Sequence, residues 1–240
     1  MNEKLSPNFV PNEKPERLAS MRLAQAKSQG QNVPREVEIL GARFVIDDGV
    51  HSPAFNADAR FFASQIIPRI PAGSDFLEVG CGTAVVSVLA ARNGAQVTAT
   101  DISEASIENA KKNAGLNGVD FHILQGDVYD ALPGGALYDI IYWNVPFGYM
   151  RTDAKNLSMF ERAVFDPGHE GLRKYILGAK EHLKKGGKLL LGYSSTLGDM
   201  GAVNSYAKQA GLQFFPLATT MNTNNLKHTY QLELLIAHNP

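Results

Sequence analysis

The stretch DFLEVGCGTAVVSVLAARNGAQVTATD, residues 75–101, decides the fold of this chain. It opens with a short apolar run, passes through the turn GCG at residues 80–82, and continues with small and apolar residues at helical spacing. A second apolar run follows at residues 96–101 and ends on an aspartate, Asp101. The order strand, glycine turn, helix, strand predicts a βαβ unit with two parallel strands.

The same alternation of apolar and helical segments continues to the C-terminus. We expect helices at 84–93, 103–115 and 169–185, among the first five strands. The last two strands have only a loop between them, too short for a helical crossover, so we expect them to pair antiparallel. The expected strands cover residues 75–80, 96–101, 120–126, 138–144, 188–194, 212–219 and 230–237. The pattern therefore predicts an α/β protein with a seven-stranded, mostly parallel sheet, helices on both faces and a C-terminal antiparallel hairpin.

Residues 1–35 lack this alternation, and we interpret them as an N-terminal extension that precedes a domain at 36–240. A helix is expected inside the extension, because Pro15 suits a first helical position and Gly30 is a stop signal. The domain itself starts with an alternating stretch typical of a short hairpin. A helix that Pro68 ends follows it.

Composition narrows the functional classes. The chain has 23 basic and 24 acidic residues, a formal net charge of −1, and no run rich in Lys or Arg, which argues against a nucleic-acid partner. No apolar run approaches the roughly 20 residues of a membrane span, so no membrane partner is expected. The single cysteine fits a reducing compartment, and we expect a cytoplasmic protein. Six scattered histidines lack the spacing of metal ligands, and no metal site is predicted.

The glycine turn and the acidic residues around it indicate a ligand site. Glycines at 80 and 82 allow the backbone to approach a ligand closely, and ligands of open parallel sheets bind at the carboxyl ends of the strands. Asp101, at the end of the next strand, is placed to accept both hydroxyls of an adenosine ribose. The alternative is a tight turn followed by an aspartate that caps a helix.

A nicotinamide dinucleotide is disfavoured as the ligand. The dinucleotide fingerprint needs a small residue where this chain has Val85, and Glu78 would sit badly beside a pyrophosphate. A carboxylate at position 78 suits a cationic ligand better. Asp127 follows the third strand and is placed to accept from an adenine amino group, with the backbone of Val128 nearby and Ile102 packed on the ring. Asp127 is alternatively a simple turn residue.

Taken together, EVGCGTA, Asp101, GDV and NVPF resemble the Rossmann-like S-adenosylmethionine-dependent methyltransferases over roughly residues 36 to 240. The chain looks most like the branch with an N-P-P-[YF] motif, which methylates exocyclic or amide nitrogens, and especially like the glutamine-amide methyltransferases. The resemblance implies S-adenosylmethionine as cofactor. The cofactor-binding residues that it implies are Glu78, Gly80, Cys81, Gly82, Asp101, Ile102, Asp127, Val128 and Asn144. For Cys81, packing inside the turn is the simpler interpretation.

The resemblance assigns the acceptor to Asn144, Val145, Pro146 and Phe147. In that branch the asparagine oxygen and the next carbonyl accept the two hydrogens of a planar nitrogen, which turns its lone pair toward the sulfonium methyl. Such catalysis is mainly positioning. Phe147 is expected to stack on the acceptor or lie near the cationic carbon. The alternative for Asn144 is a residue that caps a turn.

Two departures from the branch shape the functional prediction. Val145 replaces its first proline, which keeps the carbonyl but loses the fixed φ. The separate substrate-recognition domain of that branch is missing. We therefore expect methyl transfer to a nitrogen of a small-molecule substrate, under a lid made of the N-terminal helix and residues 151–168. The oligomeric state is left open.

Two other functions fit the same contacts. One is an azetidine-2-carboxylate synthase, in which the amino group of S-adenosylmethionine attacks its own γ-carbon and expels methylthioadenosine. There Asn144 would orient the amine, and aromatics would shield the sulfonium. The candidate aromatics are Phe55, Tyr142, Trp143 and Tyr175. The second is a non-catalytic S-adenosylmethionine-binding protein. His51 is placed to touch the methionine end of the cofactor, or is an ordinary loop histidine.

Overall fold

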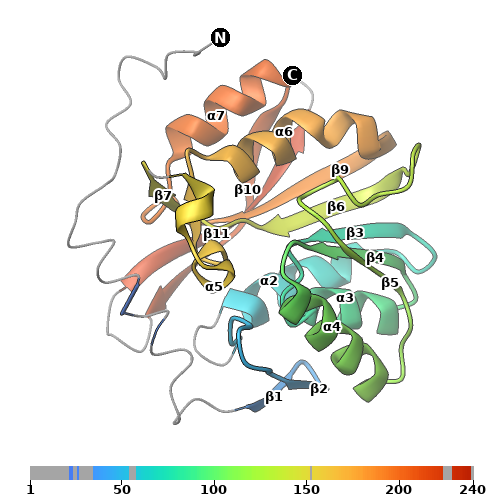
Figure 1. Ribbon diagram of the computed structural model, residues 1–240. Helices are drawn as coiled ribbons and strands as arrows, with labels where there is room; N and C mark the ends of the chain where they lie inside the picture. The colour runs from blue at the N-terminus through green and yellow to red at the C-terminus, as the bar shows by residue number, and fades with distance from the viewer. Residues whose placement is uncertain are drawn as a thin grey trace.

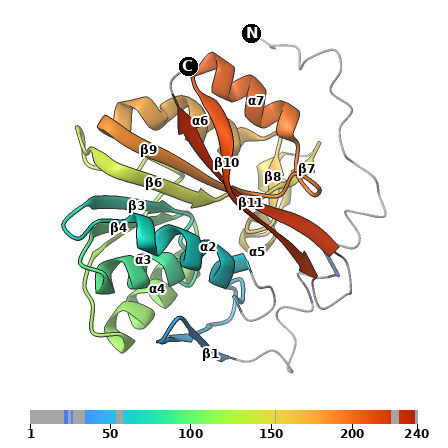
Figure 2. The same ribbon diagram turned by 180° about the vertical axis from the view of Figure 1, so that it is seen from behind.

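The computed structural model describes residues 22, 23, 26, 35–53, 58–151, 153–223 and 229–238. Arg22, Leu23 and Ala26 are helical, and the rest of the helix predicted after Pro15 lies outside the described residues. Figures 1 and 2 show one large twisted sheet between two layers of helices. In the described part of the chain, no helix is long and apolar enough to cross a membrane.

The central sheet has seven strands in the order β10-β11-β9-β6-β3-β4-β5. They are β3 (Asp75–Val79), β4 (Gln96–Asp101), β5 (His122–Gln125), β6 (Tyr138–Asn144), β9 (Leu183–Tyr193), β10 (Gln213–Thr223) and β11 (Thr229–His238). The strands β5, β4, β3, β6 and β9 pair in parallel, whereas β11 is antiparallel to both β9 and β10. The predicted mostly parallel sheet and its C-terminal antiparallel hairpin are confirmed. The chain moves outward from β3 to β5 and then returns to β6 on the other side of β3, which creates a switch point there.

Helices cover both faces of the sheet, as predicted. On one face lie α2 (Asp58–Ile66), α3 (Val85–Arg92) and α4 (Glu104–Leu116), and on the other lie α6 (Glu170–His182) and α7 (Met200–Gln209) (Figure 1). The sequence analysis missed α7, whose clearest signal is the Asp199 side chain that accepts the Ala202 N–H at 3.1 Å. It also extended α6 too far. That helix ends at His182, and β9 begins at Leu183.

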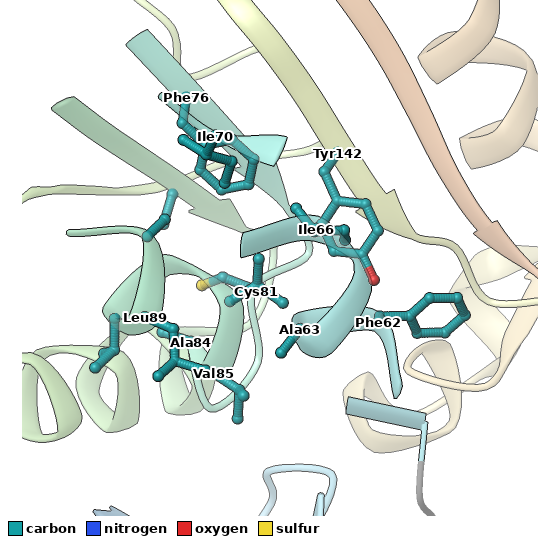
Figure 3. Packing of buried hydrophobic residues seen from close by; sticks show 14 of the residues in the cluster. Phe62, Ala63, Ile66, Ile70, Phe76, Cys81, Ala84, Val85, Leu89 and Tyr142 are labelled. Carbon is teal, nitrogen blue, oxygen red and sulfur yellow. The ribbon is translucent and has the colours of Figure 1, made fainter. Parts of the chain in front are cut away.

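Side chains of the central strands point alternately to the two helical layers, because successive residues of a strand face opposite sides. Phe76 and Tyr142 pack with α2 and α3 in one core, and Leu77 and Trp143 pack with α6 and α7 in the other. Figure 3 shows part of the first core, with Tyr142 beside Phe62 of α2. Burial on both faces explains why these strands read as continuous apolar runs.

Two small sheets flank the large one. The predicted hairpin is formed by β1 (Glu36–Ile39) and β2 (Ala42–Val45), which pair antiparallel. Beyond β6, β7 (Gly148–Met150) pairs in parallel with β8 (Phe165–Pro167), and between them lie η2 (Ala154–Asn156) and α5 (Met159–Arg162). Farther toward the N-terminus, η1 (Ile67–Arg69) follows α2, so that α2 ends before Pro68 as predicted.

The β1–β2 hairpin is fixed to the domain by Asn113 of α4, whose side chain is fully buried. Its Oδ1 accepts the Val45 N–H at 2.8 Å, and its Nδ2 donates to the carbonyls of Val45 and Thr83, each at 3.0 Å. One amide thus joins the hairpin, α4 and the loop that follows the glycine turn. Because the chain runs from β2 directly into the loop at residues 49–53, this contact also positions that loop.

Replacement of Asn113 by Ala is expected to destabilise the protein by about 2–4 kcal/mol, because it leaves the Val45 N–H and the Thr83 carbonyl without a side-chain partner in a buried place. Urea denaturation followed by circular dichroism measures the change. Lys111→Ala, an exposed position on the same helix, is the control and should change stability by less than about 0.5 kcal/mol. Equal stability of the two variants would contradict this account of Asn113.

Candidate active site

A cavity of about 200 Å³ lies at the carboxyl ends of β3, β4 and β6. This is the edge of the sheet where the switch point predicts a ligand. Among the predicted site residues, those that line it are Glu78, Gly80, Cys81, Gly82, Asp101, Ile102, Asp127, Val128, Asn144 and Pro146. Residues 49–53 and the segment Met159–Ala163 contribute to its wall as well. The structure therefore brings together residues from seven separate stretches of the chain.

Glycine is needed in this turn for two reasons, the backbone conformation and the close approach of a neighbouring side chain. Gly80 and Gly82 have φ angles of 60° and 53°, in the left-handed region that favours glycine. A Cβ on Gly80 would lie 2.3 Å from Nε1 of Trp143, so any side chain at position 80 would displace the indole. The turn can hold its shape only with glycine at this position, which leaves its backbone open to the cavity.

Glu78 caps the helix that follows the turn. The residue before α3, Ala84, offers no side-chain cap, and Oε2 of Glu78 instead accepts the Ser87 N–H at 2.7 Å and the Ser87 hydroxyl. Burial raises the pKa of Glu78 to about 8, even though the two hydrogen bonds from Ser87 lower it; the nearby charge of Asp101 is a smaller contribution in the direction of burial. A buried carboxylate of this kind ionises readily only when a cation lies beside it.

Asp101 is held at the rim of the turn by two backbone groups. Its Oδ2 accepts the Gly82 N–H at 2.9 Å and its Oδ1 accepts the Ser103 N–H at 2.8 Å. Burial raises the pKa of Asp101 despite these bonds. Each oxygen of a carboxylate has more than one acceptor position, so Asp101 keeps the capacity to accept hydroxyl groups from the cavity.

Cys81 packs rather than reacts. Its thiol is buried among apolar side chains (Figure 3), and burial raises its pKa well above the usual value. Such a thiol is not a nucleophile at neutral pH. The Cys81 N–H donates to the Thr100 carbonyl at 3.0 Å and ties the turn to β4.

Asp127 and Val128 form the wall of the cavity after β5. Nζ of Lys174 on α6 lies 3.1 Å from Oδ2 of Asp127 and also pairs with Asp130. Val128 is buried and has a φ of 55°, a conformation that β-branched residues rarely adopt and that costs of order 1–3 kcal/mol. Strain of this kind clusters at ligand sites, because there the surrounding structure has to hold a set backbone shape.

Asn144 ends β6 and lines the cavity. Its Oδ1 is buried and, among the described residues, accepts no hydrogen bond. Room for it depends on Gly192, the neighbouring residue on β9, where a Cβ would lie 3.1 Å from Oδ1 of Asn144 and 3.1 Å from the Phe62 ring. An orphaned buried acceptor is costly, and its natural partner is a donor on a ligand.

Two predicted acceptor residues lie elsewhere. Val145 is buried in the core beneath α6 and α7, and Phe147 packs edge-on against Tyr193, with ring centroids 6.2 Å apart. Neither residue lines the cavity. The expected stacking of Phe147 on the acceptor does not fit this arrangement. Asn144 and Pro146 line the cavity and the two residues alternating with them do not, as expected for extended chain.

The aromatics named for sulfonium shielding divide in the same way. Tyr142 and Trp143 line the cavity, whereas the Tyr175 hydroxyl donates to the Leu190 carbonyl at 2.6 Å inside the opposite core. Phe55 lies outside the described residues. His51 does line the cavity, and its Nδ1 is buried with no hydrogen-bond partner in the described parts of the chain. Burial lowers the pKa of His51 to about 4, so its ring is neutral at pH 7.

The sequence analysis missed Asp58, the first residue of α2, which also lines the cavity. Its Oδ1 accepts from the Tyr230 hydroxyl at 2.9 Å and from the Asn222 amide at 2.8 Å. Burial raises the pKa of Asp58 to about 6. In the sequence an aspartate at a helix start reads as a cap, and only the approach of β10 and β11 reveals the other role. Nowhere in the described ranges do three or more His, Cys, Asp or Glu side chains gather as a metal site would require.

Comparisons with known proteins agree with this geometry. Residues 76–168 match the model of a methyltransferase domain. A Methanocaldococcus jannaschii protein with the provisional name protein N5-glutamine methyltransferase is 28% identical over 70% of this chain and 84% of its own length. The release factor glutamine methyltransferase of Neisseria gonorrhoeae is 31% identical over 71% of this chain, which spans 66% of that relative.

Among solved structures, the 16S rRNA methyltransferase of T. thermophilus in complex with S-adenosylmethionine and guanosine is similar. It has a TM-score of 0.59 and 19% identity, over 85% of this chain and 50% of that one. At this identity the likeness concerns the fold. It confirms the Rossmann-like architecture that the resemblance implied.

The predicted partners need correction. A small-molecule substrate and no nucleic-acid partner were expected, because the sequence has no run of basic residues and the recognition domain of the N-P-P-[YF] branch was not identified in it. The similar proteins are instead named for protein glutamine and for ribosomal RNA, which are macromolecular acceptors. The prediction was wrong because an overall charge balance and a missing domain say little about what docks at the mouth of a cavity.

Glu78 makes the stability of the ligand-free protein depend on pH. Its folded pKa of about 8 exceeds the ordinary 4.5, so the folded state retains a proton that the unfolded state releases. Its contribution to stability therefore falls as pH rises between these values. Glu78→Gln removes this fall, and we expect the variant to exceed the parent by ~1–3 kcal/mol at pH 8 and by much less at pH 5.

Thermal unfolding of both proteins from pH 5 to pH 8.5 measures this difference. Glu181→Gln, at an exposed position on α6, is the matched control and should follow the parent at every pH. A stability difference between the Glu78 variant and the parent that does not change with pH would contradict the assignment.

Proposed function

We propose that this chain, which belongs to the Rossmann-like S-adenosylmethionine-dependent methyltransferases, methylates the side-chain amide nitrogen of a glutamine in a protein acceptor. The two relatives described above, which match 70% and 71% of the chain, are both named for glutamine methylation. They favour a protein over RNA as the acceptor. The proposal concerns the acceptor and its chemistry, and the cofactor follows from the family.

The observation that carries the proposal is the Oδ1 of Asn144, which is buried and has no donor from the described residues, on a residue that lines the cavity. A primary amide brings two N–H donors in one plane, and one of them can satisfy this oxygen. The nitrogen is then held in a fixed orientation, with its lone pair free to face the methyl group. The rate gain expected from such an arrangement comes from orientation, because a sulfonium is already a good leaving group.

The carboxylates around the cavity suit the cofactor. S-adenosylmethionine supplies an activated methyl group on a positively charged sulfur, and it carries a cationic amino group as well. Glu78 and Asp101 are buried carboxylates with raised pKa values, and a cation beside them offsets part of the cost of their ionisation. Asp101 would accept the ribose hydroxyls, and Asp127 with the backbone of Val128 would accept and donate at the adenine.

The mouth of the cavity supports a large acceptor. The segment Met159–Ala163 contributes to the wall, and Met159 is 51% exposed. A large side chain that is exposed at the rim offers apolar contact to whatever enters. The segment is joined to the N-terminal extension by Arg22, which pairs with Glu161 at 3.3 Å. That the extension and this segment close as a lid, and that residues 1–35 and 36–240 are separate units, stay predictions.

Mass spectrometry of purified protein with S-adenosylmethionine and a glutamine-containing peptide tests the function. We expect S-adenosylhomocysteine and a peptide heavier by one methyl group, with fragments that place it on the glutamine side chain. The same peptide with glutamate in place of glutamine is the matched control, because it keeps the shape and lacks the amide nitrogen. Methylation of both peptides, or of RNA fragments only, would contradict the proposal.

The cofactor alone provides a second control. Methylthioadenosine that forms in the absence of any acceptor, above the rate without protein, would show that the cofactor's own amino group is the nucleophile. That result would replace methyl transfer with internal cyclisation to azetidine-2-carboxylate. Binding of the cofactor without either product would indicate a non-catalytic binding protein.

Asn144→Ala is expected to lower kcat about a hundredfold or more, the usual loss when one preorganised hydrogen-bonding group is removed from an active site. Affinity for S-adenosylmethionine, measured by calorimetry, should change by much less, since the turn and Asp101 remain intact. Asn204→Ala, exposed on α7, is the control. Equal activity of the Asn144 variant and the parent would refute the role given to this side chain.

A further inference from the structure

Asp58 presents a second carboxylate to the acceptor side of the cavity. Tyr142 and Asn144 line the same cavity from β6. Burial raises the pKa of the Tyr142 hydroxyl, and the nearby carboxyl groups of Glu78 and Asp58 contribute in the same direction. One helical turn after Asp58, the ring of Phe62 and Oδ1 of Asn144 both border the Cβ position of Gly192, each at 3.1 Å. Figure 3 shows this part of α2 next to Tyr142. Asp58 and Asn144 therefore line the same cavity, one from the start of α2 and the other from the end of β6.

The partners of Asp58 hold it without neutralising it. Tyr230 on β11 and Asn222 on β10 both donate to Oδ1, and Asn222 also donates to the Tyr230 oxygen at 2.8 Å. Neither partner carries a positive charge. Oδ2 receives no hydrogen bond from another side chain in the part of the chain that the structure describes. Among the described lining residues the only Lys or Arg is Arg162, which belongs to α5 on the rim.

A carboxylate that is largely shielded from water and held only by neutral donors is expensive, and groups of this kind are frequent at functional sites. A helix cap alone would not explain the arrangement, because side chains from β10 and β11 both donate to one carboxylate oxygen of a residue that lines the cavity. The other titratable residues that line the cavity are Glu78, His51, Tyr142, Cys81, Arg162, Asp101 and Asp127. Asp101 accepts the Gly82 and Ser103 N–H groups, and Asp127 pairs with Lys174. Glu78 is engaged with α3, and burial keeps both His51 and the Tyr142 hydroxyl uncharged at neutral pH.

We propose that Asp58 is the catalytic base of this enzyme. Its carboxylate removes the proton that the acceptor nitrogen loses on methylation. This inference rests on the proposed function and adds a residue that the sequence pattern does not assign. The nitrogen lone pair forms the new bond to the methyl carbon, and the pair of the carbon–sulfur bond passes to sulfur as S-adenosylhomocysteine leaves. The methylated nitrogen then carries one hydrogen too many, which the Asp58 carboxylate takes up. Charge and atoms balance without a further reactant.

The same geometry assigns Tyr230 and Asn222 as positioning residues. Their two hydrogen bonds favour the ionised form of Asp58 against the effect of burial, and the resulting pKa of Asp58 is about 6. A base of this strength is ionised at neutral pH and still able to accept a proton. Loss of the Tyr230 hydroxyl leaves the carboxylate less stabilised, so its pKa should rise.

The test is the pH dependence of kcat/KM with S-adenosylmethionine and the glutamine peptide, for the parent and three variants. The parent should lose activity below about pH 6. Asp58→Asn should lower kcat by ~10²–10⁴-fold, the usual contribution of a general base, and abolish this acidic limb. Tyr230→Phe should keep most of the activity at high pH, and its kcat/KM should begin to fall at a higher pH than that of the parent. Asp120→Asn, exposed before β5, should match the parent.

Several outcomes overturn the proposal. An Asp58→Asn protein with kcat within threefold of the parent refutes it. The proposal is also refuted if Asp58→Asn has low activity but its kcat/KM still falls at the same acidic pH as that of the parent. If Asp58→Asn fails to fold, an unmoved limb in Tyr230→Phe refutes it alone. A parent protein that binds the cofactor but leaves the glutamine peptide unmodified removes the proposed function, and the role of Asp58 falls with it. Activity of the parent thus tests the proposed function, and the pH profiles of the variants test the role of Asp58 as the base.

Discussion

The burial of carboxylates at one end of a parallel sheet is the constraint on which the rest of this structure depends. Glu78, Asp101 and Asp58 line a single cavity, and burial raises the pKa of each. Their partners are backbone N–H groups, hydroxyls and an amide, all of them neutral. Ionisation of these carboxylates in the folded chain therefore carries an electrostatic cost, which a cationic ligand beside them offsets. A sulfonium nucleoside with an amino group supplies such a charge.

Close packing around the end of β6 fixes the positions of the side chains at the cavity. Trp143 lies against Gly80, and Gly171 on α6 leaves room for the far end of the same indole. Asn144 depends in the same way on Gly192. Three glycines from different elements thus make room for two consecutive residues at the end of β6. Asn113 adds a fourth fixed point, because it ties the N-terminal hairpin to the loop after the glycine turn. Rigid support of this kind is what a site that acts by positioning needs.

Much of this arrangement follows from the sequence. The strand boundaries of β4 and β6 agree with their apolar runs to the residue, and the C-terminal hairpin follows from a loop too short for a crossover. The glycine turn, Asp101 and Asn144 meet at one cavity because strand ends of a parallel sheet meet at one edge. The helix α7 escaped detection because its apolar pattern is weak, and α6 was extended too far because two glycines and several lysines gave no clear boundary. The acceptor was misjudged for another reason, since composition does not report on the surface at the mouth of a cavity.

What the sequence by itself determined is therefore local and periodic: the strands, most helices, the glycine turn and the residues at the strand ends. These follow from spacing along the chain, because the period of a strand or helix and the conformational freedom of glycine act over a few residues. Tertiary structure alone decided which of the four residues 144–147 face the cavity, that Glu78 caps α3, and that Asp58 meets Tyr230 and Asn222. The last contact joins residues 164 and 172 positions apart in the chain. No local pattern encodes such a meeting, because it arises only when the last two strands close the sheet beside α2.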